Sequence, residues 1–348
     1  MNVYCSSRPL KAGLKLTLSA QKQKGLLETK MAEIPLQKPS PVNQRRERLT
    51  NAVSTVNQII LGKEKQVNLA FSCLLARGHL LIEDLPGVGK TTLAHALATV
   101  IGVNYQRIQF TSDLLPADIL GVSIYRRDLE MFEFHRGPIF SELVLADEIN
   151  RATPKSQSAL LEAMAEGQVT IEGGTHILPK PFFVIATQNP LDLIGTFPLP
   201  DSQLDRFLLS ISLGFPEPEA ERDLLTARDR VQMLRDTKPD INPDDILKLN
   251  QDCQTVHVSE ALLDYVQALL AETRNSRWFE HGLSPRAGIA MLKCAKAFAF
   301  LEGRDFATPE DVKAIFPSLT RHRMALPHGV ETSVGEQISE LLNQVAIP

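Results

Sequence analysis

The sequence predicts an α/β protein with a parallel sheet, followed by a second region made of helices. Up to about residue 215, short apolar segments of strand length alternate with segments of helical pattern. Beyond Gly214 the apolar spacing is helical, with prolines between the segments. Short buried strands that alternate with helices are typical of a parallel sheet covered on both faces. With 348 residues, of which 43% are hydrophobic, the chain can bury a large core without disulfides or metals.

Regular structure is expected to begin near Asn43. Apolar residues recur at helical spacing over Arg45–Ile60, and a second helical pattern over Val67–Leu75 ends by Gly78. The alternation that defines the sheet begins directly afterwards. Strands are expected over His79–Glu83, Tyr105–Phe110, Leu143–Ala146, Phe182–Ala186 and Phe207–Ile211, with helices over Lys90–Ile101 and Ser156–Ala165.

The boundary between the two regions is expected near residue 215. It divides the chain into an α/β domain over residues 43–215 and a helical domain over residues 216–348. The expected helices of the second domain are Glu217–Arg230, Pro243–Cys253, Ser259–Thr273, Pro285–Leu301, Pro309–Ile315 and Glu331–Gln344.

Residues 1–42 are expected to form a disordered extension outside both domains. From Met1 to Lys30 there is no helical period and a single acid, Glu28, and a proline-punctuated stretch follows. Met31 is an alternative start of the chain, and a transit peptide is a second interpretation. A secretory signal is disfavoured, because the segment has no continuous apolar stretch.

Composition narrows the classes of function. A formal net charge of −4 and a pI of about 6.1 give no overall electrostatic footprint for nucleic acid, which disfavours such a partner. Neither the four cysteines nor the eight histidines cluster at metal-ligand spacing. The scattered cysteines favour a reducing compartment, so we expect a cytoplasmic protein. No apolar run reaches the roughly 20 residues that span a membrane.

The strongest motif is Leu-Pro-Gly-Val-Gly-Lys-Thr-Thr over Leu85–Thr92, between a strand and a helix. That context is the one a phosphate-binding P-loop requires. Gly87 and Gly89 let successive N–H groups point at phosphate oxygens, while Lys90 reaches the β- and γ-phosphates and Thr91 binds Mg²⁺. The expected nucleotide-binding residues are Pro86, Gly87, Val88, Gly89, Lys90, Thr91 and Thr92.

One position departs from the motif, because Asp84 stands where the pattern has glycine. Aspartate tolerates unusual backbone angles better than most residues. A glycine-rich turn without a ligand is the alternative interpretation.

Two acids follow the apolar strand that begins at Leu143. A buried parallel strand brings Asp147 and Glu148 to the carboxyl edge of the sheet, where ligands bind in open α/β folds. Asp147 fits a Mg²⁺ ligand, and Glu148 fits the base that orients the attacking water. An ordinary strand end is the alternative, which the P-loop upstream disfavours.

Two further residues are candidates at the same site. Asn189 ends a strand and could hydrogen-bond the γ-phosphate or the water, or it could simply be a turn residue before Pro190. Arg286 lies in the first turn of a helix whose N-cap is Ser284 and whose first residue is Pro285. From there it could face a nucleotide, although a surface arginine is the alternative.

The order of these motifs resembles the AAA+ superfamily, with Walker A at Gly87–Thr92, Walker B at Val144–Glu148, sensor 1 at Asn189 and sensor 2 at Arg286. Longer phrases are similar to the MoxR family, and the resemblance covers about residues 45–345. The phrases are Arg107–Pro116, Gly137–Phe140, Asp147–Ala152, Gln157–Met164 and Leu199–Phe207.

The resemblance implies that residues 43–215 are an AAA+ nucleotide-binding domain and residues 216–348 its helical lid. It implies a five-stranded sheet of order 5-1-4-3-2, a hairpin within Gln168–Pro179 and an insert within Asp113–Glu133. It also implies a homo-oligomer, in most relatives a hexameric ring, that binds ATP and Mg²⁺. In such a ring Arg206 matches the arginine finger that reaches a neighbour's nucleotide. Arg286 is expected to serve the nucleotide of its own subunit.

The function that this resemblance implies is an ATP-hydrolysing chaperone that remodels, matures or assembles client protein complexes, together with a von Willebrand factor A-domain partner. A metal-chelatase motor subunit is the main alternative. A nucleic-acid motor is disfavoured by the acidic balance, and a non-hydrolysing scaffold is disfavoured by Glu148 and Arg206.

Overall fold

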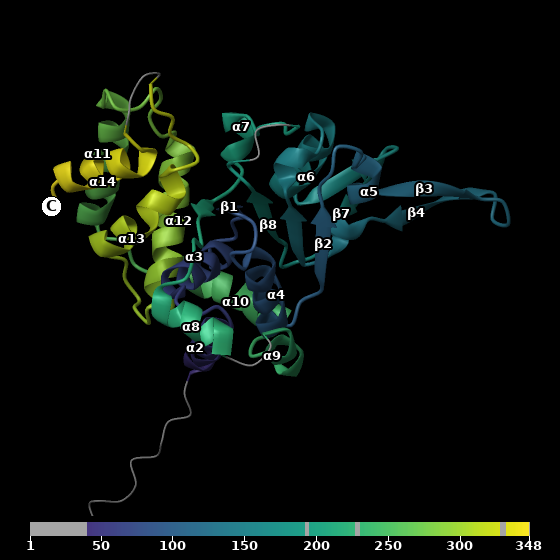
Figure 1. The fold of residues 1–348 in the computed structure, drawn as a ribbon, viewed down its shortest axis with the longest axis horizontal. Helices are drawn as coiled ribbons and strands as arrows, with labels where there is room; N and C mark the ends of the chain where they lie inside the picture. The colour runs from purple at the N-terminus through teal and green to yellow at the C-terminus, as the bar shows by residue number, and fades with distance from the viewer. Residues whose placement is uncertain (1–39, 192–194, 227–229, 328–331, 348) are drawn as a thin grey trace, which may run out of the picture. The chain divides into compact units, whose positions relative to one another are not determined.

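A five-stranded parallel sheet forms the centre of the fold (Figure 1). Its strands are β1 (Leu80–Glu83), β2 (Tyr105–Gln109), β5 (Leu143–Asp147), β8 (Phe183–Gln188) and β9 (Leu209–Ile211). Their order across the sheet is β2-β5-β8-β1-β9. Counted along the chain among themselves and read from β9, this is the order 5-1-4-3-2, so the expected sheet is confirmed.

The structure is a computed structural model, and it describes residues 40–191, 195–226, 230–327 and 332–347. Residues 1–39 of the expected extension, Met31 included, lie outside the described residues. The first described helix begins at Pro41, slightly before the expected start near Asn43.

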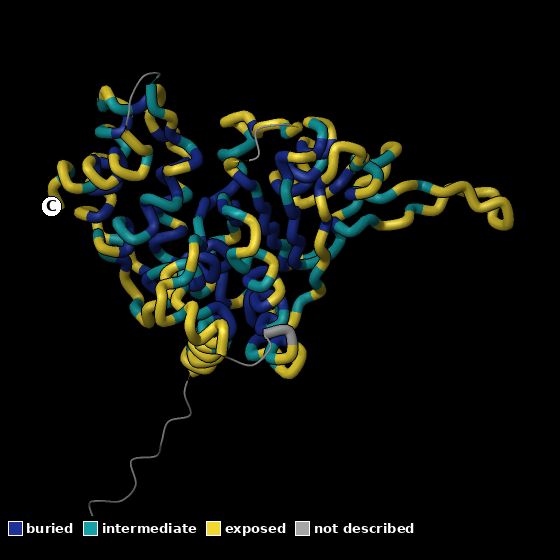
Figure 2. Tube along the Cα trace, in the orientation of Figure 1, coloured by how far each residue is buried: buried dark blue, intermediate teal, exposed yellow. Residues whose placement is uncertain are grey.

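Alternate residues of the strands point to two hydrophobic cores. In β5, Leu143 and Leu145 belong to a core that includes residues of three helices, α2 (Pro41–Ile59), α3 (Glu64–Leu75) and α4 (Lys90–Ile101). Val144 and Ala146 belong to a second core with α6 (Pro154–Glu166). Figure 2 shows this buried centre in dark blue. Both faces of the sheet are therefore covered, as the continuous apolar strands predict.

Two antiparallel hairpins are added to the sheet region. The β6–β7 hairpin (Gln168–Ile171 and Gly174–Ile177) is the one expected within Gln168–Pro179. The helix α5 (Pro116–Leu120) leads into the β3–β4 hairpin (Gly121–Arg126 and Met131–Arg136), which therefore extends past the expected end of the insert at Glu133. Figures 1 and 2 show it as a long exposed arm.

The remaining described segments are helices and the loops that connect them. Two single-turn 3-10 helices flank β5, namely η1 (Pro138–Phe140) and η2 (Ile149–Arg151). The short helix α7 (Asp201–Leu204) follows β8. The helices after β9 are α8 (Pro218–Thr226), α9 (Arg230–Asp236), α10 (Pro243–Gln254), α11 (Glu260–Asn275), α12 (Pro285–Leu301), α13 (Pro309–Thr320) and α14 (Val334–Gln344).

Three expected helices differ from those described, and the last of them, expected over Glu331–Gln344, starts at Val334 after the N-cap Ser333. The helix expected over Glu217–Arg230 is described over Pro218–Thr226, residues 227–229 lie outside the described residues, and α9 starts at Arg230. The helix expected over Pro309–Ile315 continues through Pro317 to Thr320. Proline in a helix removes one hydrogen bond and costs about 3 kcal/mol. Full burial of Phe316 and Leu319 offsets that cost.

The helical region packs directly on the sheet region. α12 packs against α3, and α13 packs against β9. Residues Pro41–Pro348 form one compact unit, so the boundary near residue 215 remains a prediction from the sequence. Among the described residues, no helix has the length and apolar character needed to cross a membrane.

Candidate functional site

The loop between β1 and α4 has the geometry of a phosphate-binding loop. Gly87 and Gly89 have φ of 84° and 98°, in the left-handed region that side chains with a Cβ rarely adopt. Lys90 Nζ donates to the carbonyls of Asp84 at 2.6 Å and Leu85 at 3.1 Å. Lys90, the first residue of α4, therefore closes the loop by reaching back to its first two residues.

The unexpected Asp84 is a structural residue of this loop. Its Oδ1 accepts a hydrogen bond from Leu85 N at 2.9 Å, and its Oδ2 accepts bonds from Ser212 Oγ at 2.9 Å and Gly214 N at 2.7 Å. Burial raises the pKa of Asp84, but the hydrogen bonds from Gly214, Leu85 and Ser212 outweigh it and lower the pKa below the usual value. Asp84 thus ties the phosphate loop to the chain that leaves β9.

Asp147 ends β5 with both carboxylate oxygens engaged. Thr187 Oγ1 donates to Oδ1 at 2.6 Å, which fixes the rotation of the carboxylate. Arg107 donates to Oδ2 from Nη2 at 2.6 Å and from Nε at 3.0 Å. The second oxygen therefore already faces a cation, the Arg107 guanidinium.

Glu148 directly follows, with its backbone in the left-handed region at φ 57°. Its Oε2 accepts a hydrogen bond from Gln109 Nε2 at 2.7 Å and lies 3.3 Å from Arg151 Nε. Its backbone N–H donates to Thr187 Oγ1 at 2.9 Å. Gln109 and Arg151 thus hold the carboxylate of Glu148 at the carboxyl edge of the sheet, and Thr187 holds its backbone.

Asn189 follows β8, the strand that lies between β5 and β1. It is buried, and its Oδ1 accepts a hydrogen bond from Leu191 N at 3.2 Å, as in the alternative of a turn residue. Because parallel strands end at one edge, the sheet brings Asn189 between the phosphate loop and the two acids. The structure therefore groups Lys90, Asp147, Glu148 and Asn189 at one edge.

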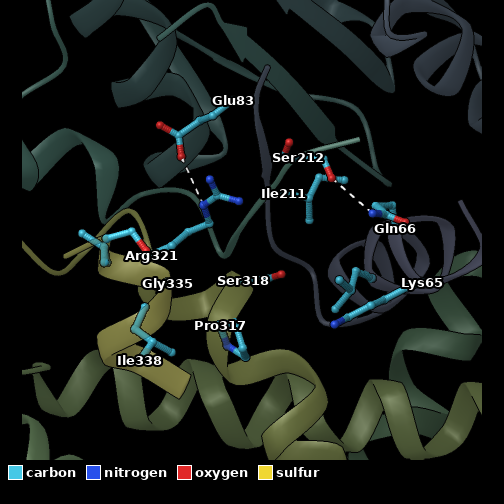
Figure 3. A pocket seen from close by; sticks show the side chains of 13 residues that line it. Lys65, Gln66, Glu83, Ile211, Ser212, Pro317, Ser318, Arg321, Gly335 and Ile338 are labelled. Carbon is cyan, nitrogen blue, oxygen red and sulfur yellow. Dashed lines mark hydrogen bonds and ion pairs between the residues drawn. The ribbon is translucent and has the colours of Figure 1, made fainter. Parts of the chain in front are cut away.

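A cavity of about 590 Å³ begins at Glu83, next to the phosphate loop (Figure 3). Its walls come from α3, the end of β9, α13 and α14. Gln66 Nε2 donates to the Ser212 carbonyl at 3.2 Å, and Arg321 Nε lies 3.9 Å from Glu83 Oε2. Sequence reasoning missed Gln66 and Arg321, since nothing in their local sequence marks them and only the packing of the helical region brings them here.

Arg206 and Arg286 lie elsewhere, at the amino edge of the sheet. Both line a cavity of about 260 Å³ with Gly78 and His79, the residues that precede β1. Arg286 Nη1 is 4.0 Å from Asp205 Oδ2. The phosphate loop follows the opposite end of β1, so this placement differs from the expectation that Arg286 faces the nucleotide of its own subunit.

The side chains at the carboxyl edge fit a nucleotide with magnesium. Thr91 follows Lys90 in the first turn of α4, and Asp147 supplies a carboxylate oxygen of the kind that Mg²⁺ prefers. The described residues contain no group of three or more His, Cys, Asp or Glu that could hold a metal by themselves. A magnesium ion in a phosphoryl-transfer site needs no such group, because phosphate oxygens and waters supply most of its ligands.

Comparison with known proteins extends the similarity over both regions. The family described as ATPase family associated with various cellular activities (AAA) matches residues 79–209, and an AAA lid domain matches residues 271–342. Uncharacterized protein YeaC of Bacillus subtilis is 43% identical over 304 residues, covering 86% of this chain and 95% of YeaC. Chaperone MoxR1 of Mycobacterium tuberculosis is 39% identical over 316 residues, covering 86% of this chain and 82% of MoxR1.

A solved structure agrees with these relatives. The crystal structure of a protein from Cytophaga hutchinsonii matches with a TM-score of 0.79 at 32% identity, covering 96% of this chain and 99% of that one. Since similarity at this level spans the sheet region with its phosphate loop as well as the helical region, the chain belongs to the MoxR family of AAA+ ATPases and hydrolyses ATP.

Proposed function

We propose that this ATPase works in the cytoplasm as a hexameric ring that remodels, matures or assembles client protein complexes. The observation that carries the proposal is a separation across the sheet. The phosphate loop lies at the carboxyl edge, and Arg206 and Arg286 both lie at the amino edge. β1 has four residues, so its ends are about 13 Å apart. A ring offers each nucleotide the arginines of the next copy.

Within one copy, the proposed roles follow the chemistry of each side chain. Lys90 and the loop N–H groups bind the phosphates, and Thr91 and Asp147 hold Mg²⁺, which neutralises phosphate charge. Glu148 orients the attacking water, and Asn189 hydrogen-bonds the γ-phosphate or that water. The next copy supplies Arg206, and also Arg286, against the charge of the transferring phosphoryl group.

The cavity beside Glu83 is the proposed place of the nucleotide base and ribose. It adjoins the phosphate loop and has both apolar and polar walls, as nucleotide pockets commonly do. Its walls come from both regions of the chain, so a bound nucleotide would hold the helical region against the sheet. Hydrolysis and release would then loosen that contact.

The exposed arm supports a role with protein partners. Ile124, Tyr125 and Phe132 on the β3–β4 hairpin are 46%, 50% and 63% exposed, and Leu129 and Met131 near the tip are exposed as well. Exposed apolar groups of this kind suit transient contacts with other proteins. The relative named as a chaperone supports the same role. A von Willebrand factor A-domain protein is the proposed partner.

The test combines the purified chain with a purified von Willebrand factor A-domain protein. We expect six copies per particle in sedimentation with ATP, and binding of the partner that is tighter with ATP than with ADP. Tyr125→Ser with Phe132→Ser should weaken that binding. A chain that stays monomeric with ATP and with ADP would contradict the proposal. Equal affinity for the partner with ATP and with ADP would contradict it as well. ATP-driven metal insertion into a tetrapyrrole would favour the chelatase alternative.

A further inference from the structure

Several cations surround the small cavity at the amino edge of the sheet. Besides Arg206 and Arg286, its walls include three Arg or Lys residues that no motif singled out: Arg77, Lys293 and Arg323. Among the described residues that line it, Asp205 carries the only carboxylate. The charge balance around Asp205 therefore decides whether the cavity is neutral or cationic.

Asp205 is already neutralised by another residue. Arg323 Nε donates to Asp205 Oδ1 at 2.7 Å, and Arg323 Nη2 donates to the Phe207 carbonyl at 2.6 Å. Arg286 reaches Asp205 only at 4.0 Å. Within the described parts of the chain, no carboxylate lies within ion-pair distance of Arg77, Arg206 or Lys293. The cavity therefore carries a surplus of positive charge.

Arg77 and Lys293 are held where they can act together with Arg206 and Arg286. Lys293 lies on α12 two turns after Arg286, and the exposed Ile289 lies between them on the same face. Arg77 has φ of 57°, in the left-handed region that a residue with a Cβ rarely adopts. A Cβ on the adjoining Gly78 would lie 2.3 Å from Leu208 Cβ, so tight packing holds this turn beside the segment of Arg206.

We propose that Lys293 and Arg77 join Arg206 and Arg286 in a cationic receptor for the phosphate end of the nucleotide held by a neighbouring copy. This inference rests on the proposed ring. The ligand chemistry follows from the cavity, because a small space with surplus cations favours an oligophosphate. The neighbour as its source follows from the sheet, because the chain's own phosphate loop lies at the opposite edge.

Single variants test whether the charge of Lys293 matters. Lys293→Met keeps the apolar stem and removes the charge, so turnover should fall at least tenfold while ATP affinity stays unchanged. Lys293→Arg should restore most of the turnover. Lys296→Met is the matched control, since Lys296 lies one turn further on α12, outside this cavity, and donates to the Gln254 carbonyl. It should hydrolyse ATP like the unmodified chain.

Arg77→Asn gives a second variant that keeps the backbone. Asparagine tolerates the left-handed region, so the fold of the turn is preserved while the cation is lost. Turnover should fall several-fold, again without a change in ATP affinity. Unchanged turnover in both Arg77→Asn and Lys293→Met would overturn the inference.

Mixing experiments show which nucleotide Lys293 serves. Lys90→Ala chains cannot hold phosphates but keep an intact receptor, so mixing them with Lys293→Met chains should raise turnover above either parent. Fluorescence transfer between labelled chains verifies that copies exchange. Lys90→Ala chains could restore turnover when mixed with Arg206→Ala chains but not when mixed with Lys293→Met chains. That result would show that Lys293 serves the nucleotide of its own copy. It would overturn this inference and leave the proposed ring intact.

Two other results are decisive in different ways. Failure to rescue Arg206→Ala as well would contradict the proposed ring, and the inference with it. In a last experiment, tripolyphosphate is added to the monomeric Lys90→Ala chain and to the double variant that also carries Lys293→Met. If the single variant binds tripolyphosphate and the double variant does not, the cavity is a site for free oligophosphate. That outcome would overturn the assignment to a neighbour's nucleotide.

Discussion

The carboxylate of Glu148 is fixed by contacts that do not depend on its charge alone. Gln109 donates to Oε2 at 2.7 Å, and the backbone N–H of Glu148 is held by Thr187. An amide at this position can keep the shape of the side chain. It cannot take up the proton of an attacking water. Glu148 is therefore the residue at which binding and turnover can be separated.

Glu148→Gln should bind ATP within about threefold of the unmodified chain and lose turnover by about 10²–10⁴-fold, the usual worth of a general base. Isothermal titration measures the affinity and phosphate release measures the turnover. Near-normal phosphate release would remove Glu148 from the mechanism. Weakened binding would instead indicate that the substitution disturbs the site rather than the chemistry.

At the scale of elements, the phosphate loop depends on a strand that is distant in sequence. Asp84 accepts hydrogen bonds from Ser212 and Gly214, which follow β9 on the way to the helical region. The P-loop pattern has glycine here, so Asp84→Gly restores the pattern. The structure predicts that this restoration is harmful, because Ser212 and Gly214 lose their acceptor.

Asp84→Gly should lower the free energy of unfolding by about 2–5 kcal/mol, since hydrogen bonds to a charged group contribute about 1.5–3 kcal/mol each. Asp84→Asn keeps the shape and should lose less. Urea unfolding at pH 7 measures both. A glycine variant as stable as the unmodified chain would show that Asp84 does not hold the loop to β9.

The same elements explain what the sequence could predict. Alternate residues of each strand enter two buried cores, so the apolar runs in the sequence predict where the strands lie. The P-loop and the two acids could be predicted because each directly follows a strand. Asp84, Gln66 and Arg321 act through partners far along the chain, which local patterns do not contain. The helix expected to end at Ile315 continues through Pro317 to Thr320, because Phe316 and Leu319 are buried in the core.

Arg286 illustrates the same limit at the site. Its position in the first turn of a helix was predictable from Ser284 and Pro285, and the helix bounds agree. Which edge of the sheet that turn approaches depends on how α12 and α13 dock. Arg323 contributes to that docking by binding Asp205 and the Phe207 carbonyl, beside the packing of α12 on α3 and of α13 on β9. No pattern within the helix itself records that contact.

At the scale of the whole molecule, two buried histidines couple stability to pH. Burial lowers the pKa of His79 to about 4 and, together with Arg323, lowers that of His322 to about 3. The Val184 N–H donates to His79 Nδ1 at 3.1 Å, so Nε2 carries the proton and faces the Met164 carbonyl at 3.3 Å. His322 Nε2 lies 3.0 Å from the Phe207 carbonyl. Both rings are neutral in the fold.

The unfolded chain takes up these protons first as pH falls, because its histidines titrate near 6.5. The stability from the neutral rings is therefore complete at pH 7 and above and is lost as pH falls from about 6.5 toward the folded values. At pH 5 each ring should cost about 2 kcal/mol of unfolding free energy. Urea unfolding at pH 7 and pH 5 measures the loss, and His322→Gln should reduce it. Equal stability at both pH values would show that the two rings do not couple folding to protons.

In the proposed ring, each ATP is hydrolysed between two copies, with the phosphate loop of one and Arg206 of the next. Arg206→Ala alone should bind ATP and lose about 10³–10⁵ in turnover, the usual worth of an arginine finger. Lys90→Ala alone should not bind ATP. A mixture of the two contains interfaces with an intact loop and an intact arginine.

The direct measurement is the ATP turnover of that mixture, with exchange of copies verified by fluorescence transfer. A site shared between copies predicts turnover clearly above both parents, reached as the copies exchange. Turnover that stays at the level of the parents after complete exchange would mean that Arg206 does not act on a neighbour's nucleotide, and would contradict the shared site.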